Sequence, residues 1–542
     1  MSGGPSRKST AVIRTNRSTS VPDTGRRILR RLGLAVVTLV AGGVSIAACT
    51  TGDDPDPDPG ALQRFSTQKL EWQGCTDFAT SPRETEILAK APAQCAWLTV
   101  PLNYDKPQGA TTTVAVLRFA ARGQAQGSLV FNPGGPGGAG LLGALGVGAQ
   151  LTKSRITERF DVIGFDPRGV GATKPAADCY TEGGTTRGDK VFPSMTMTSS
   201  LTEADTRAVL DRCAQGSGGA EGLTQMGTRT TARDLDVLRS ALGEEKLTYL
   251  GQSYGTRLGA VYAEQFPQRV RAMVLDGAFD PNLGTIERRL SAYGGFQAAF
   301  EAMAASCAKA AKCPLGMDAK AATSVFQSIV RPLRDKPVPA LDQKLDFDTA
   351  VAGVMAGLYS PDKWPTIISG LTQLRQGRGD TLLELTFDLA GGDPKTVVNP
   401  NFTEAAFAIN CMDEQRLTPQ DATRLRAQAY EVAPFMNPGG DPAAGARDAC
   451  EFWPAPPTLG IPYAQNVKDL PGTLVISITG DPTTPHEGAI SLAGKLGSAL
   501  LTVKGEGHTV VSAGTNTCVD TIAADYLIDL KLPAEMPTCS VA

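Results

Sequence analysis

The sequence predicts an α/β fold with a mostly parallel central sheet and a large helical insertion. Short apolar runs typical of buried strands alternate with segments of helical periodicity in the first half of the chain. These runs are 128–131, 160–165, 247–250 and 271–275. From about residue 283 the pattern becomes Ala-rich and helical, and strand patterns return at 472–479 and 499–503. In such a sheet, functional loops gather at the C-terminal ends of the strands.

This pattern divides the 542 residues into a core in two parts with an insertion between them. We expect the core at 65–282 and 466–542, and a mostly helical cap at 283–465 that covers the functional edge of the sheet. Two to three separate domains are the alternative for a chain of this length. The net charge of −3 provides no electrostatic attraction to nucleic acid.

The first 64 residues do not resemble part of the fold. A basic region ends at Arg31, and an apolar run from Leu32 to Ala48 precedes Cys49. This order predicts a secretory signal peptide at 1–48. The small residues before Cys49 resemble a bacterial lipobox, so we expect a lipidated cysteine, a tether at 49–64, and attachment to the outer face of the cell membrane or release from it. A plain signal peptide and a one-pass anchor are the alternatives.

Cysteine usage also fits an exported chain. Of eleven cysteines, ten remain once Cys49 is set aside, and an even number favours disulfides. Pairing neighbours in chain order is the simplest expectation. None of the spacings is that of a zinc site, and histidine is scarce, so we expect no metal.

The segment 247–256, Leu-Thr-Tyr-Leu-Gly-Gln-Ser-Tyr-Gly-Thr, is the part of the chain most typical of catalysis. An apolar run enters Gly-x-Ser-x-Gly and a helix-like segment follows, which is the context of a nucleophile elbow. Gly251 and Gly255 are expected because the turn is too tight for a Cβ at either position. We therefore predict Ser253 as a nucleophile, with a Gly/Ser-rich surface turn as the alternative.

A glycine-rich loop, Asn-Pro-Gly-Gly-Pro-Gly-Gly-Ala-Gly (132–140), follows the apolar run 128–131. Phosphate binding is disfavoured because both common glycine-rich phosphate motifs are absent. The alternative is that bare N–H groups approach a substrate oxygen, as in an oxyanion hole. Because Pro136 has no N–H, the predicted donors are Gly135 and Tyr254, the residue after the serine.

A serine hydroxyl needs a base, which is usually a histidine held by a carboxylate. Each returning strand pattern ends at a candidate, the first at Asp481 and the second just before His508. The order Ser253, Asp481, His508 is that of α/β-hydrolases. The chain has two histidines, and the other, His486, is the less favoured base because it lies directly beside the acid's loop.

Two further residues belong to this prediction. Asp276 also ends a strand pattern, and some hydrolases take their acid from that strand. A helix cap or a turn residue is the simpler role for either aspartate. We favour Asp481 because its turn lies one strand before the histidine. Thr484, in the same turn, is a candidate hydrogen-bond partner of the acid's loop.

Six ordered motifs make the chain resemble one family. They are Asn-Pro-Gly-Gly-Pro-Gly-Gly (132–138), Asp-Pro-Arg-Gly-Val-Gly (166–171), Gly-Gln-Ser-Tyr-Gly-Thr (251–256), Val-Leu-Asp-Gly (274–277), Gly-Asp-Pro-Thr-Thr-Pro (480–485) and Gly-Glu-Gly-His (505–508). Over about residues 70–540 the chain looks like the actinobacterial secreted tripeptidyl aminopeptidases, which are proline iminopeptidase-like α/β-hydrolases (serine peptidase family S33).

The resemblance implies an exopeptidase that releases short peptides from a free N-terminus beneath a helical cap. It also implies that Ser253, Asp481 and His508 are nucleophile, acid and base. One departure is Pro133, where iminopeptidases have histidine, and some family members act mainly as esterases.

An aminopeptidase also has to hold a protonated N-terminus, which requires a carboxylate in the cap. Asp413 and Glu414 are the candidates, because a disulfide at the neighbouring Cys411 would fix their position. A solvated acidic pair at a helix end is the alternative.

The sequence thus predicts an exported serine hydrolase that acts on peptides by acyl transfer, in the manner of a tripeptidyl aminopeptidase, without metal or cofactor. The nearest alternative is a carboxylesterase or lipase with the same residues. An envelope binding protein on an inactive hydrolase fold is a third.

Overall fold

The computed structural model describes residues 59–179, 198–310, 312–388, 401–511, 514 and 516–541. The expected signal peptide, Cys49 and the first part of the tether lie outside these residues. Helix α1 (Pro59–Ser66) covers the last residues of the range expected as a tether. None of the helices in the described part of the chain has the length and apolar character needed to cross a membrane.

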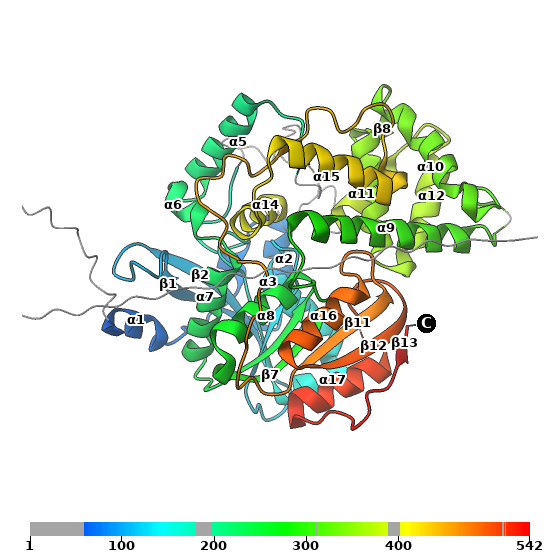
Figure 1. The fold of residues 1–542 in the computed structure, drawn as a ribbon. Helices are drawn as coiled ribbons and strands as arrows, with labels where there is room; N and C mark the ends of the chain where they lie inside the picture. The colour runs from blue at the N-terminus through cyan, green and yellow to red at the C-terminus, as the bar shows by residue number, and fades with distance from the viewer. Residues whose placement is uncertain are drawn as a thin grey trace, which may run out of the picture. The chain divides into compact units, whose positions relative to one another are not determined.

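A nine-stranded sheet has the order β1-β2-β4-β3-β6-β7-β11-β12-β13 (Figure 1). Strand β2 is antiparallel to β1 and β4, and all the other neighbouring pairs are parallel. The predicted mostly parallel sheet is therefore confirmed. The strands are β1 (Ala93–Pro101), β2 (Thr111–Phe119), β3 (Ser128–Asn132), β4 (Asp161–Phe165), β6 (Leu247–Gln252), β7 (Val270–Asp276), β11 (Leu474–Gly480), β12 (Ala499–Glu506) and β13 (Cys539–Ser540).

Helices cover both faces of the sheet, which explains why the central strands are apolar throughout. Alternate side chains of a strand point to opposite faces, so Val130 belongs to one core cluster and Phe131 to the other. The first cluster includes side chains of α7 (Thr228–Ala241), α8 (Tyr254–Gln265) and α16 (His486–Leu496). The second includes side chains of α3 (Gly140–Gln150) and α17 (Thr517–Asp529).

Between β7 and β11 lies a helical insertion with a core of its own, called the cap here (residues 285–432, α9 to α15). Its buried aromatic rings pack on one another, as Phe300 and Phe326 do with ring centroids 5.2 Å apart. The cap helices are α9 (Thr285–Cys307), α10 (Ala322–Val330), α11 (Phe347–Leu358), α12 (Trp364–Leu374), α13 (Asp380–Asp388), α14 (Phe402–Asp413) and α15 (Pro419–Val432). A short hairpin, β8 (Val338–Ala340) and β9 (Gln343–Leu345), joins two of them.

A segment from the first half of the chain packs with the cap. Helices α5 (Glu203–Gly216) and α6 (Gly219–Thr224) lie between β4 and β6 in the sequence, yet α6 contacts α14 (Figure 1). Just before α5, β5 (Thr198–Ser199) pairs with β10 (Arg447–Asp448). Residues 198–224 fall within the expected core range 65–282, because a short strand pairing across such a separation leaves no local pattern in the sequence.

Five disulfides join the ten described cysteines, and each joins neighbours in chain order. The pairs are Cys75–Cys95, Cys179–Cys213, Cys307–Cys313, Cys411–Cys450 and Cys518–Cys539. The simplest expected pairing is therefore confirmed. Each bridge restricts the unfolded chain and so stabilises the fold.

The Asp-Pro-Arg-Gly motif after β4 supports the structure of the core. Arg168 is buried and pairs with Asp234 of α7, with Nε 2.5 Å from a carboxylate oxygen. The same guanidinium donates to the carbonyls of Pro101 and Leu102 at the end of β1. The motif thereby fixes the loop after β4 to helix α7 and to the end of β1.

Candidate active site

Ser253 lies in the turn between β6 and α8 that Gly-x-Ser-x-Gly predicts. Its φ of 54° and ψ of −122° are strained for a residue with a Cβ. A Cβ at Gly255 would lie 2.8 Å from the carbonyl oxygen of Asn132, and one at Gly251 would lie 2.6 Å from the ring of Tyr249. The tight-turn interpretation of both glycines is confirmed.

The glycine-rich loop lies directly against this turn. A Cβ at Gly134 would lie 2.8 Å from Cβ of Ser253 and 3.0 Å from the backbone nitrogen of Tyr254. Among the described residues, no protein acceptor bonds the N–H of Gly135. The N–H of Tyr254 opens α8, where a helix offers no acceptor. Within the described residues, both predicted oxyanion donors thus lack a protein acceptor. Tyr254 directly follows Ser253, and Gly135 follows the glycine that lies against it.

Helix α14 of the cap also packs against the glycine-rich loop. A Cβ at Gly135 would lie 3.2 Å from the ring of Phe402, and one at Gly137 would lie 2.9 Å from the nitrogen of Ala406. These glycines therefore allow the cap to pack against the backbone of the loop.

Asp481 and His508 form a hydrogen-bonded pair at the ends of two neighbouring strands. Nδ1 of His508 lies 2.8 Å and 3.0 Å from the two carboxylate oxygens of Asp481. Because a carboxylate accepts hydrogen bonds, Nδ1 carries the proton and Nε2 is left as the basic nitrogen. The imidazole is therefore held in the tautomer that a general base requires.

The turn after Asp481 fixes the orientation of its carboxylate. Oδ1 accepts hydrogen bonds from the N–H groups of Thr483 (3.0 Å) and Thr484 (2.8 Å), and Oδ2 accepts one from the Thr484 hydroxyl (2.9 Å). The hydroxyl also lies 3.3 Å from Nδ1 of His508. The predicted contact of Thr484 with the acid's loop is confirmed.

The alternative acid, Asp276, contacts the backbone of the histidine loop. Its Oδ2 accepts hydrogen bonds from the N–H groups of Val510 (2.7 Å) and Val511 (2.8 Å), while Oδ1 is buried and has no hydrogen-bond partner among the described residues. Burial raises the pKa of this carboxyl to about 6. Asp276 therefore secures the loop that carries His508, and Asp481 is the aspartate bonded to the imidazole.

Ser253 and His508 approach each other across the end of β7. The N–H of Ser253 donates to the carbonyl of Asp276 (2.8 Å). A Cβ at the next residue, Gly277, would lie 3.2 Å from Cε1 of His508. Among the described residues no hydrogen bond joins the serine hydroxyl to His508, and such bonds are commonly long without substrate and tighten in the complex.

The second histidine takes no part in this pair. His486 is the first residue of α16, and its buried Nδ1 has no hydrogen-bond partner in the part of the chain that the structure describes. Its ring is not bonded to Asp481 within the described part of the chain.

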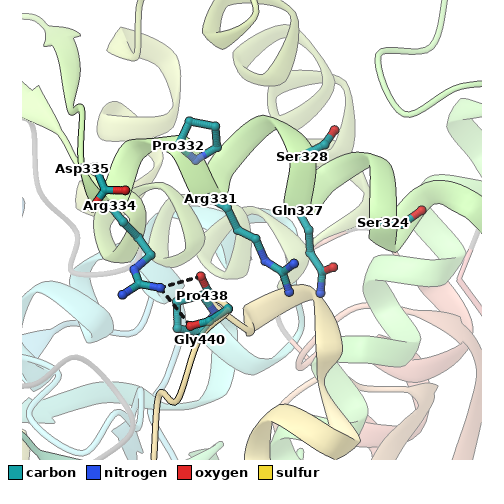
Figure 2. Close-up of a pocket in the computed structure, with 10 residues that line it drawn as sticks. Ser324, Gln327, Ser328, Arg331, Pro332, Arg334, Asp335, Pro438 and Gly440 are labelled. Carbon is teal, nitrogen blue, oxygen red and sulfur yellow. Dashed lines mark hydrogen bonds between the residues drawn. The ribbon is translucent and has the colours of Figure 1, made fainter.

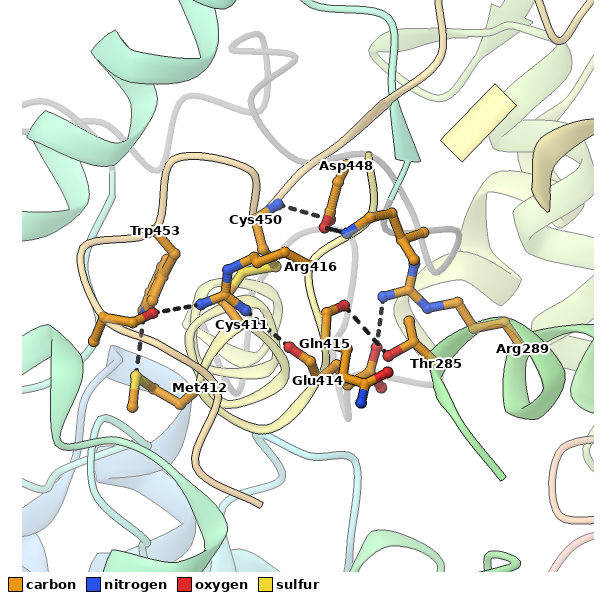
Figure 3. The surroundings of a disulfide bond; sticks show 12 residues. Thr285, Arg289, Cys411, Met412, Glu414, Gln415, Arg416, Asp448, Cys450 and Trp453 are labelled. Carbon is orange, nitrogen blue, oxygen red and sulfur yellow. Dashed lines mark hydrogen bonds and ion pairs between the residues drawn. A yellow bond between two sulfur atoms is a disulfide. The ribbon is translucent and has the colours of Figure 1, made fainter. Parts of the chain in front are cut away.

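Asp413 and Glu414, the candidates for binding a substrate amine, both have protein partners. Asp413 accepts the N–H of Thr228 (2.9 Å) and pairs with Arg257 (3.4 Å). Glu414 pairs with Arg289 beside the Cys411–Cys450 disulfide (Figure 3). It also pairs with Arg288.

Charge and burial at this pair have opposing effects. Burial by itself would raise the pKa of Glu414, but Arg288 and Arg289 lower it to about 2. Burial raises the pKa of Asp413, and Arg257 opposes that rise. The interpretation as a solvated acidic pair is wrong, because both residues are buried. A substrate ammonium at Glu414 would have to share it with two guanidinium groups.

A hollow of about 560 Å³ lies between the end of α10 with the turn that follows it and residues 438–440. Figure 2 shows the residues that line it. Arg334 in its wall donates to the carbonyls of Pro438 (3.0 Å) and Gly439 (2.8 Å). None of the site residues predicted from the sequence lines this hollow.

A serine on a strand–turn–helix corner, at the same edge of a mostly parallel sheet as a hydrogen-bonded aspartate–histidine pair, is the arrangement of a serine hydrolase. Residues 127–514 match the family described as alpha/beta hydrolase fold. The chain belongs to this family.

The chain is also similar to three named bacterial proteins. Serine protease Hip1 of Mycobacterium tuberculosis (strain ATCC 25618 / H37Rv) is 41% identical over 486 residues, which cover 87% of this chain and 91% of that protein. Carboxylesterase B of the same strain is 36% identical over 93% of this chain and 96% of that protein. Tripeptidyl aminopeptidase of Streptomyces lividans is 30% identical over 94% of this chain and 95% of that protein.

Proposed function

We propose that this serine hydrolase releases short peptides, tripeptides in particular, from the free N-termini of peptide substrates. The hydrogen bond from His508 Nδ1 to Asp481 carries the catalytic part of the proposal, since it leaves Nε2 free to take a proton. The proposed action on peptides is supported by two relatives. One is 41% identical to this chain and is named a serine protease, and the other is 30% identical and is named a tripeptidyl aminopeptidase.

In the proposed mechanism Ser253 attacks the carbonyl carbon while His508 takes the hydroxyl proton. The N–H groups of Gly135 and Tyr254 hold the oxyanion of the tetrahedral intermediate. His508 then protonates the leaving amine, and the acyl group stays on Ser253. Water attacks this acyl-enzyme with His508 again as base, while Asp481 keeps the imidazole oriented and stabilises its charged form.

The second candidate function is that of a carboxylesterase, which would use the same residues. It is supported by the relative named carboxylesterase B, which is 36% identical to this chain. The two functions differ in the need for a free amine. The amine-binding role of Asp413 and Glu414 stays a prediction, and their existing partners weigh against it.

A substrate comparison tests the choice. A tripeptide p-nitroanilide with a free N-terminus, its N-acetylated form and a short-chain p-nitrophenyl ester should be assayed side by side. A peptidase prefers the free tripeptide over the blocked one by a large factor, whereas turnover of the ester alone would establish the esterase. Ser253→Ala should abolish all three reactions and labelling by a fluorophosphonate; retained turnover would exclude Ser253 as nucleophile.

We also propose export and lipid attachment through Cys49. Five disulfides are typical of proteins in an oxidising compartment. Mass spectrometry of the N-terminal peptide should find acyl chains on Cys49, and Cys49→Ala should move the protein from the membrane fraction to the medium. An unmodified cysteine in the mature protein would contradict lipidation.

A further inference from the structure

The loop that carries His508 is bonded to the cap as well as to the sheet. The N–H of His508 donates to the carbonyl of Tyr359 (2.9 Å), at the C-terminal end of α11. Asp276 binds the same loop from the sheet side. Hydrogen bonds thus fix the backbone at His508 and just after it. One partner, Asp276, belongs to the sheet, and the other, Tyr359, belongs to the cap.

The side chain of Tyr359 also contacts the imidazole. The two rings are 5.2 Å apart between centroids, with planes inclined by 80°. Phe296 of α9 packs against Tyr359 in turn, with centroids 5.5 Å apart. A ring packed edge to face on the imidazole restricts its tilt about the Cβ–Cγ bond, and the buried Phe296 restricts the tyrosine.

The acid's loop is in contact with the same part of the cap. A Cβ at Gly295 of α9 would lie 2.6 Å from the carbonyl oxygen of Pro482, so α9 packs directly on the turn that follows Asp481. Burial raises the pKa of Tyr359 to about 12, and the charge of Asp481 adds to the rise while a hydrogen bond with Thr483 opposes it. The tyrosine hydroxyl therefore lies next to the acid's turn.

From these contacts we infer that Tyr359 is a positioning residue, through which the cap sets the orientation of the His508 imidazole. The inference rests on the proposed function, because it concerns the base of that reaction. It gives the cap a role in the chemical step beyond covering the site. A substrate too small to fill the cap should therefore still depend on Tyr359.

The test measures the second-order rate of fluorophosphonate labelling and the pH profile of kcat/KM for p-nitrophenyl acetate. Tyr359→Leu removes the ring and keeps the backbone acceptor, and Tyr359→Phe keeps the ring. Tyr359→Leu should lower the labelling rate and kcat on the order of tenfold to a hundredfold, with KM nearly unchanged and a shifted apparent pKa of the base. Tyr359→Phe should stay within about threefold of wild type, since ring packing is retained.

The matched control is Tyr293→Leu. Tyr293 is a buried tyrosine of the cap, on α9, whose pKa burial likewise raises to about 12. The groups that act on its hydroxyl are Arg289, Arg288, Tyr430 and Glu414 rather than residues of the His508 loop. Should Tyr359→Leu fail to fold, Tyr359→Met serves in its place.

Each outcome decides one question. Labelling of Tyr359→Leu at the wild-type rate, or an equal loss in Tyr293→Leu, would overturn the inference and leave the proposed function intact. Failure of the wild-type protein to label at all would instead overturn the proposed function.

Discussion

Asp481 and Asp276 follow two neighbouring parallel strands, β11 and β7, and both are buried, yet they bind different parts of the same loop. Asp481 is bonded to the imidazole of His508, whereas Asp276 is bonded to the N–H groups of Val510 and Val511. A carboxylate at the end of a strand is therefore insufficient to identify a catalytic acid. The catalytic acid is the carboxylate whose hydrogen-bond donor is the imidazole of His508.

Strand length accounts for the difference. Asp276 ends β7 and pairs with Ile476, but β11 continues to Gly480 before Asp481. Since each strand residue advances the chain by about 3.3 Å, Asp481 stands farther out along the sheet edge, where the ring of His508 lies. Asp276 lies nearer the middle of the sheet, level with Ile476, and binds the backbone of residues 510 and 511.

The same substitution at both positions tests this comparison most strongly. Asp481→Asn should lower kcat on the order of 10⁴-fold, because an amide N–H facing Nδ1 favours the wrong tautomer of His508. Asp276→Asn should cost no more than about tenfold, because an amide oxygen still accepts from a backbone N–H. Steady-state kinetics with a p-nitrophenyl ester measures both. Equal losses would mean that the two carboxylates act on the base in the same way.

A smaller effect is expected at Thr484, whose hydroxyl bonds Asp481. Thr484→Val should reduce kcat about tenfold, which corresponds to the loss of one hydrogen bond to a charged group. Thr484→Ser keeps the hydroxyl and should restore most of the activity in the same assay. If Thr484→Ser is as slow as Thr484→Val, the methyl group rather than the hydroxyl matters.

A further effect concerns stability, and it depends on the protonation of Asp276. Burial raises its pKa from the ordinary 3.8 to about 6, so the folded protein binds this proton more tightly than the unfolded chain. Its contribution to stability is therefore full below about pH 4 and is lost as the pH rises to about 6.

Asp276→Asn lacks this titration. The difference in free energy of unfolding between variant and wild type should shift in favour of the variant by at most about 3 kcal/mol between pH 4 and 6, and then level off. Urea unfolding at four pH values measures it. A difference that does not change with pH would show that Asp276 titrates normally.

Much of the site followed from local sequence. Ser253 was identifiable because the glycines on either side of it are required by the turn itself, and His508 because the chain offers two histidines, one of which lies beside the acid. Asp413 and Glu414 show the limit of such reasoning. Their partners Arg257, Arg288 and Arg289 come from helices distant in the sequence, so no local pattern shows that these carboxylates are already paired.

The sequence by itself determined the sheet and the elbow, because strand periodicity and a tight turn depend on residues close together in the chain. It suggested the simplest disulfide pairing without fixing it. Only the tertiary structure decided which aspartate meets the imidazole, and that Tyr359 of the cap contacts it. Those choices depend on how far each strand extends and on which side chains meet after folding, and neither is recorded in the spacing of residues along the chain.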